Sequence, residues 1–489
     1  MEKLKAGLIA SSIILLTNLA FRLINQSQMM FTFPFDGTDW ATHIFELWAL
    51  GEYSFYGFVP YWYNGYILFQ HYNPGWYLFS LLFLKLSGDI LVSSFVSIVV
   101  LFCLILVGIY LFGKTQKFST LQIITFFAFF AGNALAIANF IRNGRTPELA
   151  GWTIFIFLAA LIFYYKDKPL DYKFLLFIPL LSFLLLSHFA TFILFSILLL
   201  GFFLIKPLKE KIYVVLCSLV SLSIISFWLI PLLRDFDSTY VSILNYSARF
   251  YDMGLFDIGL NIVLPIATII LFVLYWQQKN YSRTELIFFA PVLIFSALLA
   301  LKLTPILPIL NKLYPGPTAI FFLFFALYFL LSLKINTKTA KLSVSIIILI
   351  LALSSVAINT IDTSLFPQRT DFQKEVLSII PNIESKYIIA GEGPEFINWG
   401  IYTYAAIYHN KSTIWGGWQT TGFTSNYQRR VVGAHNELIN SNCAAFAEKL
   451  NDLGGNEVLG IKNVCATLQS CGFKEKISTE SFCLYEVTI

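Results

Sequence analysis

The sequence has few charged residues. They make up 12% of the 489 residues, whereas 57% are hydrophobic; an ordinary soluble domain has about 25% charged residues. This balance excludes a soluble globular protein and indicates an integral membrane protein. Long uncharged runs, most of them near the ~17–25 residues of a membrane-spanning helix, lie at 7–21, 90–112, 119–140, 149–165, 189–205, 212–232, 259–276, 286–301, 317–333 and 342–358.

Two further absences narrow the function. These runs carry no Asp, Glu, Lys or Arg in their interiors, which argues against an ion-coupled pump, because such pumps place ionisable groups near the middle of the bilayer. The sequence also has no phosphate-binding loop and no dinucleotide fingerprint, so an enzyme driven by nucleotides or using nucleotide sugars is unsupported.

Basic residues gather in alternate short loops, which predicts the topology. The pairs and triplets are Lys3 and Lys5; Lys114 and Lys117; Lys166, Lys168 and Lys173; Lys206, Lys209 and Lys211; Lys279 and Arg283; and Lys334, Lys338 and Lys341. If all of them face the cytoplasm, the positive-inside rule holds throughout. This requires that the short apolar segment 74–87 does not cross the membrane and that 174–186 does. The prediction is eleven spans, with the N-terminus cytoplasmic and the C-terminus outside the cytoplasm.

The fold class that we predict is a polytopic α-helical membrane protein with a small C-terminal extracytoplasmic α/β domain. The transmembrane module would be residues 1–360, with a first outer loop at about 25–89, and the α/β domain residues 361–489. Strand candidates in the tail are 387–390, 457–461 and 484–487, and a helix is expected near 444–453. The tail holds four of the six cysteines, Cys443, Cys465, Cys471 and Cys483. Disulfides are expected there, in any of three pairings; zinc binding is less favoured because no CxxC is present.

The first outer loop contains the strongest catalytic candidates. Asp36, Asp39 and His43 lie within eight residues. Asp39 is our candidate for a general base, with Asp36 second, and His43, four residues on, would share a helical face with Asp39 and orient it. The competing interpretation is that Asp36 makes a turn with Gly37 and that Asp39 caps a helix beginning at Trp40.

Other outer loops supply candidate binding residues. Arg142, Arg145 and Glu148 suit a phosphate-bearing ligand, since guanidinium groups present a fork of donors. The competing interpretation is that Glu148 only pairs with an arginine and caps a helix. His188, at a turn between apolar segments, is more typical of a structural residue. Arg249, in the long loop 233–258, either binds phosphate or extends to lipid headgroups.

Aromatic residues are concentrated in the same first loop. Residues 31–77 contain 18 Phe, Trp and Tyr, which form either an interfacial aromatic belt or stacking surfaces for sugar rings. An enzyme working outside the cytoplasm needs an activated donor delivered through the membrane. A sugar linked to a polyprenyl phosphate meets that need, because phosphate is a good leaving group and the chain lies among the spans.

These residues resemble the glycosyltransferase C (GT-C) superfamily, and more narrowly its membrane branch labelled as related to 6-pyruvoyl-tetrahydropterin synthase. The resemblance rests on Asp39-x-x-x-His43, on the Tyr- and Trp-rich stretch 60–66, on Tyr72-Asn73-Pro74 and on Arg145-x-Pro147-Glu148, and covers the chain to about residue 210. Asn73-Pro74 stands where relatives often have two prolines. The WWDYG-type acceptor motif of oligosaccharyltransferases is missing from the tail, so N-glycan transfer is not assigned.

The resemblance implies an inverting glycosyltransferase that moves a sugar from a polyprenyl-phosphate donor to an extracytoplasmic acceptor, with Asp39 as the base. Tyr63 and His71 join the substrate-binding candidates. Some relatives need a divalent metal, so Mg²⁺ or Mn²⁺ is a possible cofactor, with Asp36, Asp39 and Glu148 as candidate ligands. The expected partners are the lipid bilayer, the donor and the acceptor, and no nucleic acid. The alternatives are a lipid-linked glycan flippase and a non-catalytic assembly subunit.

Overall fold

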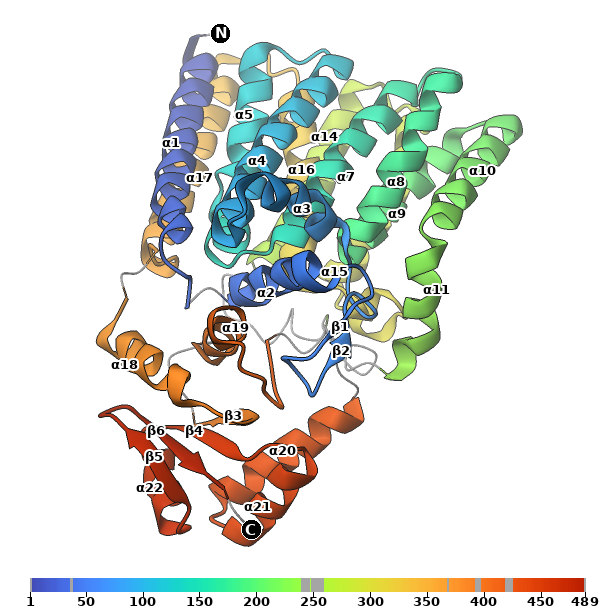
Figure 1. Cartoon of the computed structure of the whole chain (residues 1–489). Helices are drawn as coiled ribbons and strands as arrows, with labels where there is room; N and C mark the ends of the chain where they lie inside the picture. The colour runs from blue at the N-terminus through green and yellow to red at the C-terminus, as the bar shows by residue number, and fades with distance from the viewer. Residues whose placement is uncertain are drawn as a thin grey trace. The chain divides into compact units, whose positions relative to one another are not determined.

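The computed structural model describes residues 2–35, 38–238, 247, 259–366, 369–391, 397–417 and 425–487. Two of the candidate residues, Asp36 and Arg249, lie outside these ranges. The chain divides into two compact units (Figure 1). One consists of Met1–Gln26, Ser97–Phe227 and Leu244–Leu365, and the other of Ser27–Val96, Trp228–Ile243 and Phe366–Ile489. We call them the helical unit and the loop unit; the predicted domain boundary at residue 361 stays a prediction.

The helical unit is built from apolar helices, most of them long, with short 3-10 and π-helical segments between them. They are α1 (Glu2–Gln26), α4 (Ile90–Thr115, whose first residues belong to the loop unit), α5 (Thr120–Ala131), α6 (Ala134–Ala136), the π-helix η2 (Ile137–Arg142), α7 (Thr146–Tyr165), η3 (Tyr172–Leu176), α8 (Phe177–Ser187), α9 (Phe189–Ile205), α10 (Leu208–Ile224), η6 (Gly259–Val263), α14 (Leu264–Gln278), α15 (Arg283–Ala300), η7 (Thr304–Ile306), η8 (Leu310–Lys312), α16 (Pro315–Ser332) and α17 (Lys338–Asp362). Phenylalanine dominates its core: Phe112, Phe288 and Phe324 are fully buried, and Phe163 nearly so.

The prediction of a polytopic helical membrane protein is confirmed. Among the described residues, seven helices are long and apolar enough to span a membrane, or nine if each of two bent pairs counts as one span. The pairs are α5 with α6–η2, bent by 49°, and α10 with α11 (Ser226–Asp235), bent by 78°. The predicted total of eleven also counted α8 and α9, which have only 11 and 17 residues and are therefore short for a crossing.

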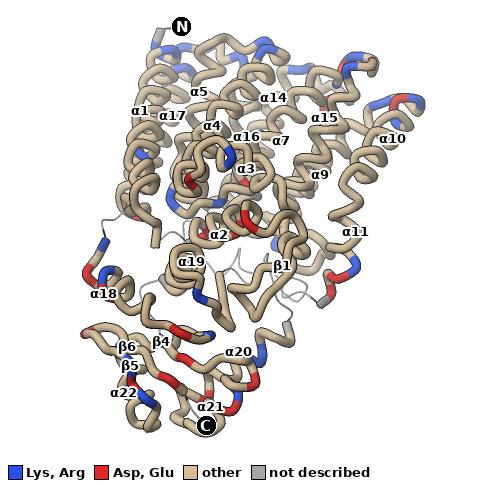
Figure 2. Tube along the Cα trace, viewed as in Figure 1, with Lys and Arg blue, Asp and Glu red and all other residues tan. Residues whose placement is uncertain are grey.

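Lysines and arginines gather at one end of the helical unit, where the chain begins, as Figure 2 shows. This follows from the sequence, because the basic loops alternate with nonbasic ones along the chain. Several of these lysines lie over aromatic rings, such as Lys168 over Tyr164 at 3.6 Å and Lys114 over Tyr110 at 5.2 Å. Such pairing suits the boundary between apolar helices and water.

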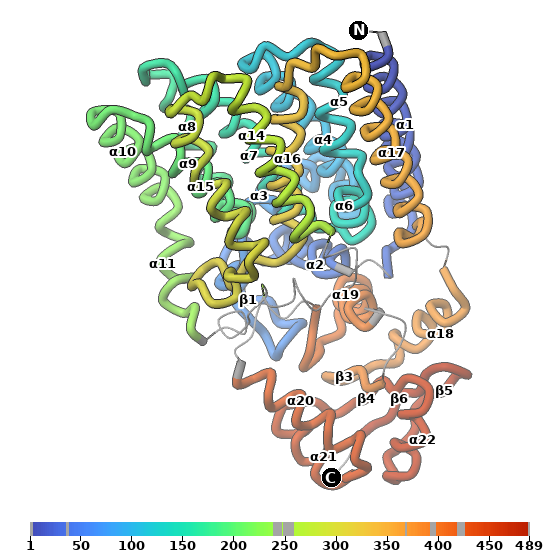
Figure 3. Tube along the Cα trace, turned by 180° about the vertical axis from the view of Figure 1, so that it is seen from behind, coloured from blue at the N-terminus to red at the C-terminus, as the bar shows by residue number. Residues whose placement is uncertain are grey.

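One arginine lies deeper than the sequence predicts. The first apolar run ends at residue 21, but α1 continues to Gln26 and therefore includes Arg22. Its side chain is buried and donates to the carbonyl oxygens of Asn359 and Thr363, the latter at 2.8 Å. These carbonyls end α17, which packs along α1 (Figure 3). Arg22 thus caps the partner helix, as cations do at helix C-termini.

The loop unit combines the first loop with the C-terminal residues. Its elements are η1 (Ser27–Met30), α2 (Thr38–Tyr53), β1 (Phe58–Val59), β2 (Tyr66–Ile67), α3 (Gly75–Ser87), most of α11, η4 (Phe236–Ser238), α18 (Asp371–Ile379), η9 (Ile380–Asn382), β3 (Tyr387–Ala390), α19 (Ile397–His409), α20 (Ser425–Ile439), α21 (Cys443–Asp452), β4 (Glu457–Ile461), α22 (Asn463–Ser470), β5 (Lys474–Ser478) and β6 (Phe482–Glu486).

Backbone hydrogen bonds join the two halves of this unit. Thr413 N donates to Tyr61 O at 2.7 Å, and Tyr63 N donates to Trp415 O at 3.3 Å. The Thr403 hydroxyl of α19 donates to Ala41 O of α2 at 3.0 Å. The first loop and the C-terminal residues therefore form one folded body, which no local sequence pattern indicates.

The C-terminal residues form a four-stranded sheet in the order β3-β4-β6-β5, with β3 parallel to β4 and the other pairs antiparallel. The three predicted strands and the predicted helix are present, whereas β5 was missed because its strand is mostly exposed and charged. Residues of β3, β4, β6 and α20–α22 share one hydrophobic core, including Val431, Phe446, Leu450, Val458 and Leu468.

Two disulfides, Cys443–Cys471 and Cys465–Cys483, cross-link these C-terminal elements. The prediction of disulfides is confirmed, and the structure selects one of the three pairings. Gly460 of β4 makes room for the second one, since a Cβ there would lie 2.6 Å from Cys483 Sγ. Register explains this closeness, because Gly460 is paired with Cys483 across the sheet.

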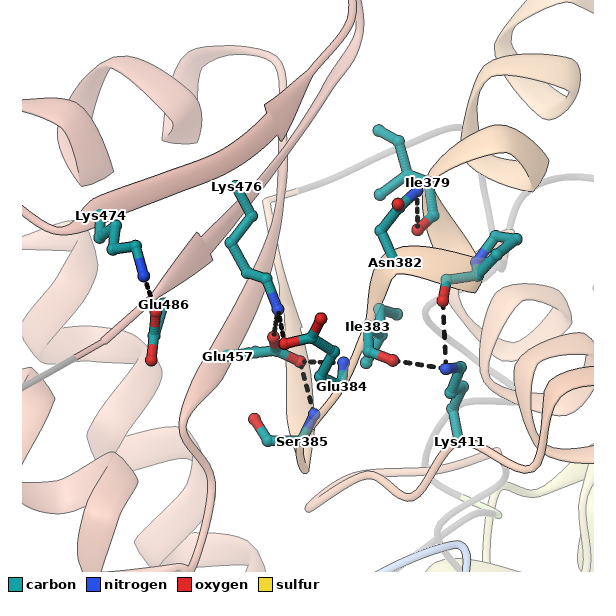
Figure 4. Close-up of polar contacts among 11 residues, drawn as sticks. Ile379, Asn382, Ile383, Glu384, Ser385, Lys411, Glu457, Lys474, Lys476 and Glu486 are labelled. Atoms are coloured by element: carbon teal, nitrogen blue, oxygen red, sulfur yellow. Dashed lines mark hydrogen bonds and ion pairs between the residues drawn. The ribbon is translucent and has the colours of Figure 1, made fainter.

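The buried Glu457 carboxylate holds the turn that leads into β3 (Figure 4). Glu457, 2% exposed, accepts hydrogen bonds from the backbone N–H groups of Glu384 and Ser385, each at 2.9 Å. Its other carboxylate oxygen pairs with Lys476 Nζ at 2.7 Å, and Lys476 also pairs with Glu384 at 2.7 Å. The Lys476 charge thereby compensates a carboxylate that would be costly to bury alone.

Candidate functional site

The acidic stretch of the first loop leads into α2. This helix begins at Thr38, two residues earlier than predicted, so Asp39 lies inside its first turn. The side chain of Asp39 is 5% exposed. A carboxylate at this position lies at the positive end of the helix dipole.

One face of α2 carries three ionisable side chains. Asp39, His43 and Glu46 are spaced by four and three residues and therefore share a helical face. His43 is 1% exposed and its Nδ1 lies 2.6 Å from the Tyr77 hydroxyl of α3. The predicted sharing of a face by Asp39 and His43 thus follows from the observed helix, and Tyr77 fixes the imidazole ring.

Glu46 is a candidate that sequence reasoning missed. It is 1% exposed, and its carboxylate accepts a 2.7 Å hydrogen bond from the Tyr66 hydroxyl of β2. Burial and the Glu46 carboxylate raise the pKa of Tyr66 well above its usual value, so Tyr66 remains a hydrogen-bond donor. The seven-residue interval from Asp39 to Glu46 was the available signal, because it places both acids on one helical face.

Tyr63 and His71 lie in the same unit with different surroundings. Tyr63 is buried and its hydroxyl donates to Gly417 O at 3.1 Å, so it holds the first loop to the C-terminal residues. His71 is half-buried in the loop before α3, and burial lowers its pKa, an effect opposed by the charge of Asp235. Asp235 is bound by the neighbouring Gln70 at 2.9 Å, which places His71 beside the last residue of α11.

A second group of candidates meets at Tyr314 in the helical unit. Glu148, 1% exposed, lies in the first turn of α7. Its two carboxylate oxygens accept hydrogen bonds from Trp152 Nε1 at 3.3 Å and from the Tyr314 hydroxyl at 2.8 Å. The Arg145 guanidinium lies over the Tyr314 ring, 5.3 Å from its centroid. We call Arg145, Glu148, His188 and Tyr314 the Tyr314 cluster.

His188 joins this cluster through its Nε2, which lies 3.4 Å from the Tyr314 hydroxyl. Its Nδ1 contacts the Thr191 hydroxyl at 2.7 Å and accepts from Thr191 N, so His188 caps the N-terminus of α9. Burial, then the charge of Arg145, lowers the pKa of His188 to about 3. The imidazole is therefore neutral at physiological pH, which suits a helix cap. Tyr314 itself was missed, because its proline-rich segment shows no periodicity.

Cationic and amide groups lie beside the cluster. A Cβ on Gly316 would meet Asn139 Nδ2 at 2.8 Å and Arg145 Nη1 at 3.2 Å, so these two donors converge on the start of α16. The Arg142 Nε donates to the Ser364 hydroxyl at 2.8 Å. Among the described residues, the buried Asn139 Nδ2 has no hydrogen-bond partner, and a buried donor of this kind calls for an acceptor.

The candidate residues therefore form two groups, one in each unit. The loop unit brings together Asp39 and His43 with Glu46, and the helical unit brings together Arg145, Glu148 and His188 around Tyr314. Within the described ranges, no three His, Cys, Asp or Glu side chains come together as metal ligands. Because Asp36 lies outside those ranges, a role for Mg²⁺ or Mn²⁺ stays a prediction.

Comparison with solved structures identifies the fold. The arabinofuranosyltransferase AftD from Mycobacteria superposes with a TM-score of 0.62 at 13% identity, over 97% of this chain and 40% of its own. The apo oligosaccharyltransferase of Archaeoglobus fulgidus gives 0.61 at 11% identity, over 93% and 69%. The oligosaccharyltransferase AglB from the same organism, in complex with an inhibitory peptide and a dolichol-phosphate, gives 0.53 at 11% identity, over 97% and 74%.

These neighbours are GT-C proteins, and the predicted GT-C fold is confirmed. The chain spans less than half the length of AftD. No family model and no curated protein matches the sequence, so the narrower branch named from the sequence motifs stays a prediction.

Proposed function

We propose, from the GT-C fold of this multi-pass membrane protein, that the chain is an inverting glycosyltransferase. It would move a sugar from a polyprenyl-phosphate donor to an acceptor hydroxyl of a protein, lipid or glycan outside the cytoplasm. In this reaction the bond between the anomeric carbon and the phosphate oxygen breaks, and a bond from the acceptor atom to the anomeric carbon forms on the opposite face. The acceptor proton goes to a carboxylate, and the polyprenyl phosphate leaves.

The observation that carries this proposal is the Asp39 face of α2. Asp39 lies in the first turn of α2, largely shielded from water, and His43 is held one turn away by Tyr77. A shielded carboxylate on a rigid helix meets the positional requirement for a general base. His43 and Glu46 act as positioning residues, because each is tied to a tyrosine of a different element, Tyr77 of α3 and Tyr66 of β2.

The groups beside the Tyr314 cluster support a phosphate site. Arg145 and Asn139 direct their donors to the start of α16, and two kinds of N–H donor suit the oxygens of a departing phosphate. Glu148 fixes the Tyr314 ring on which Arg145 lies. AglB, one of the structural neighbours, was solved with a dolichol-phosphate, and that lipid belongs to the same chemical class as the proposed donor.

The disulfides support the proposed orientation. Cysteine pairs such as Cys465–Cys483 form and persist in oxidising compartments and are rare in the cytosol. The acidic stretch of the first loop belongs to the same compact unit as these disulfides. Together with the alternation of basic and nonbasic loops along the chain, this favours an extracytoplasmic Asp39 and a cytoplasmic N-terminus.

Transfer assays with the purified full chain test the chemistry. With polyprenyl-phosphate-linked sugars and a panel of glycan, lipid and peptide acceptors, we expect Asp39→Asn to lower turnover by roughly 10²–10⁴-fold. Asp371→Asn is the matched control, since this exposed carboxylate pairs with Lys374 on the surface. Unchanged turnover in Asp39→Asn would refute the base assignment, and lipid transport without transfer would favour a flippase.

Thiol labelling in intact cells tests the orientation separately. Lys114→Cys and Lys474→Cys place single exposed thiols on a basic loop and on β5, in a Cys103→Ser background because Cys103 is exposed. A membrane-impermeant maleimide should label position 474 and spare position 114. Labelling of position 114 in sealed cells would overturn the proposed topology.

A further inference from the structure

A cluster of partly exposed aromatic rings is centred on Trp48, on the side of α2 that faces away from Asp39. Trp48 follows Asp39 by nine residues, which at 100° per residue puts it about 180° round the helix. Together with Tyr53, at the end of α2, and Tyr61, in the loop between β1 and β2, Trp48 forms a surface that we call the Trp48 platform. Its three side chains are half-buried, in contrast to the closed environment of Asp39.

The rings of the Trp48 platform are close to one another. The centroid of Trp48 lies 6.0 Å from that of Tyr53 and 5.5 Å from that of Tyr61, and the two tyrosine rings are 6.3 Å apart. Beneath them, Phe45 is fully buried, 5.6 Å from Trp48, and stacks on the Trp62 ring at 3.7 Å. This layer holds the exposed rings from below.

Hydrogen bonds hold the platform from the side. The Tyr61 hydroxyl donates to Asn410 Oδ1 at 3.2 Å, and Tyr61 O accepts from Thr413 N at 2.7 Å. The platform is therefore anchored to the end of α19 and to the segment before Ile414. A surface fixed in this way loses little freedom when a ligand binds, which favours affinity.

Polar groups surround the rings. Glu52 and Asn410 are both exposed, and Glu52 follows Trp48 by one helical turn. Burial, then the hydrogen bond with Tyr61 and the nearby Glu52, raises the pKa of Tyr53 to about 12, so its hydroxyl is a donor at neutral pH. Apolar ring faces bordered by hydrogen-bonding groups match a pyranose, which presents C–H groups on its face and hydroxyls at its edge.

We propose that the Trp48 platform binds a saccharide, with a sugar ring stacked on Trp48, the Tyr61 ring, tilted by 53°, against its side, and its hydroxyls bound by Glu52 and Asn410. The identification of this saccharide as part of the acceptor rests on the proposed transferase function. An exposed carboxylate at the rim disfavours insertion into a bilayer, since burying Glu52 among lipid would require desolvation of its charge. The site lies away from Asp39 on α2 and supplies affinity rather than chemistry.

Binding without turnover tests the site. The full chain in detergent is titrated with linear tetrasaccharides of glucose, mannose, galactose and N-acetylglucosamine, followed by calorimetry and by saturation transfer to sugar protons. We expect at least one to bind, and Trp48→Ala and Tyr61→Ala each to weaken it roughly ten-fold. Tyr172→Ala, an exposed tyrosine of the helical unit, should leave binding unchanged. If no tetrasaccharide binds, or if Trp48→Ala binds equally well, the proposal fails.

The saccharide-binding measurement does not depend on catalytic activity. Asp39→Asn should retain tetrasaccharide binding while losing transfer, and Trp48→Ala should raise the acceptor KM with little change in kcat. If no preparation transfers a sugar but saccharide binding is retained, the proposed transferase function is refuted and the saccharide site is not.

Bilayer contact is the competing role for these aromatics. A spin label at Glu52→Cys, in the Cys103→Ser background and in lipid nanodiscs, should collide more with a water-soluble nickel chelate than with oxygen. Preferential collision with oxygen would place the platform in lipid and overturn the saccharide site.

Discussion

The Tyr314 hydroxyl donates a 2.8 Å hydrogen bond to the Glu148 carboxylate, and the Tyr314 ring lies 5.3 Å beneath the Arg145 guanidinium. One phenol thus connects an acid, a cation and, through its 3.4 Å approach to Nε2, the His188 imidazole. Removal of this hydroxyl should therefore affect all three groups, whereas the ring that supports Arg145 remains in place.

Tyr314→Phe should destabilise the protein by about 2 kcal/mol, because hydrogen bonds to charged groups are worth more than neutral ones. Thermal denaturation in detergent, followed by tryptophan fluorescence, measures the change. Tyr427→Phe is the control: its hydroxyl donates to the neutral backbone carbonyl of Ile414 at 2.7 Å, and its loss should cost about 1 kcal/mol. If Tyr314→Phe loses no more stability than the control variant, the Glu148 carboxylate is not held by Tyr314.

His188 should make stability sensitive to acid. Its folded pKa, lowered to about 3 by burial and by Arg145, lies below the unfolded value of about 6.5. The stability that depends on a neutral His188 is therefore fully present above about pH 6.5 and is lost progressively as the pH falls toward 3. Between pH 7.5 and 4.5 the wild type should lose roughly 2–3 kcal/mol more than His188→Asn.

Asparagine is the informative replacement at this position because it also caps helices and does not titrate. His188→Asn should therefore keep the α9 cap at pH 7.5. Parallel acid profiles of wild type and variant would contradict the lowered pKa.

Gly460 should be intolerant of a side chain. A Cβ at this position lies 2.6 Å from Cys483 Sγ and 2.9 Å from Leu468 Cδ1, so Gly460→Val should overpack the core and cost about 1–3 kcal/mol. We also expect a larger share of Cys465 and Cys483 as free thiols, counted by mass-tagged maleimide under non-reducing conditions. Gly433→Ala, where a Cβ meets no atom within 4 Å, should be neutral or stabilising. A fully oxidised Gly460→Val would contradict the close packing.

Neighbouring lysines of β5 provide a matched pair of tests (Figure 4). Glu457→Gln removes the buried charge that pairs with Lys476 and accepts from two backbone N–H groups, and should cost about 2 kcal/mol, while Lys476 keeps its exposed partner Glu384. Glu486→Gln breaks the exposed pair with Lys474 and should cost less than about 1 kcal/mol. Limited proteolysis of the full chain compares the two. Equal protection would show that Glu457 does not anchor the turn before β3.

The sequence alone determined the membrane class, the positions of the long helices and the alternation of basic loops, because hydrophobic length and charge act locally along the chain. It also predicted three strands, the disulfide-bearing tail and the GT-C fold. The periodicity of α2 was sufficient to place Asp39 and His43 on one face. Glu46 lies on the same helical face, but its burial depends on Tyr66, which only the tertiary structure places opposite it.

Only the tertiary structure decided which distant groups meet. Tyr314 lies 166 residues from Glu148, and no local pattern links a proline-rich segment to the first turn of α7. The pairing Cys465–Cys483 follows from the register of β4 and β6, and the joining of Tyr63 to Trp415 follows from backbone hydrogen bonds between remote segments. Such contacts depend on packing over long separations in the chain, whereas helices and spans depend on neighbours a few residues away.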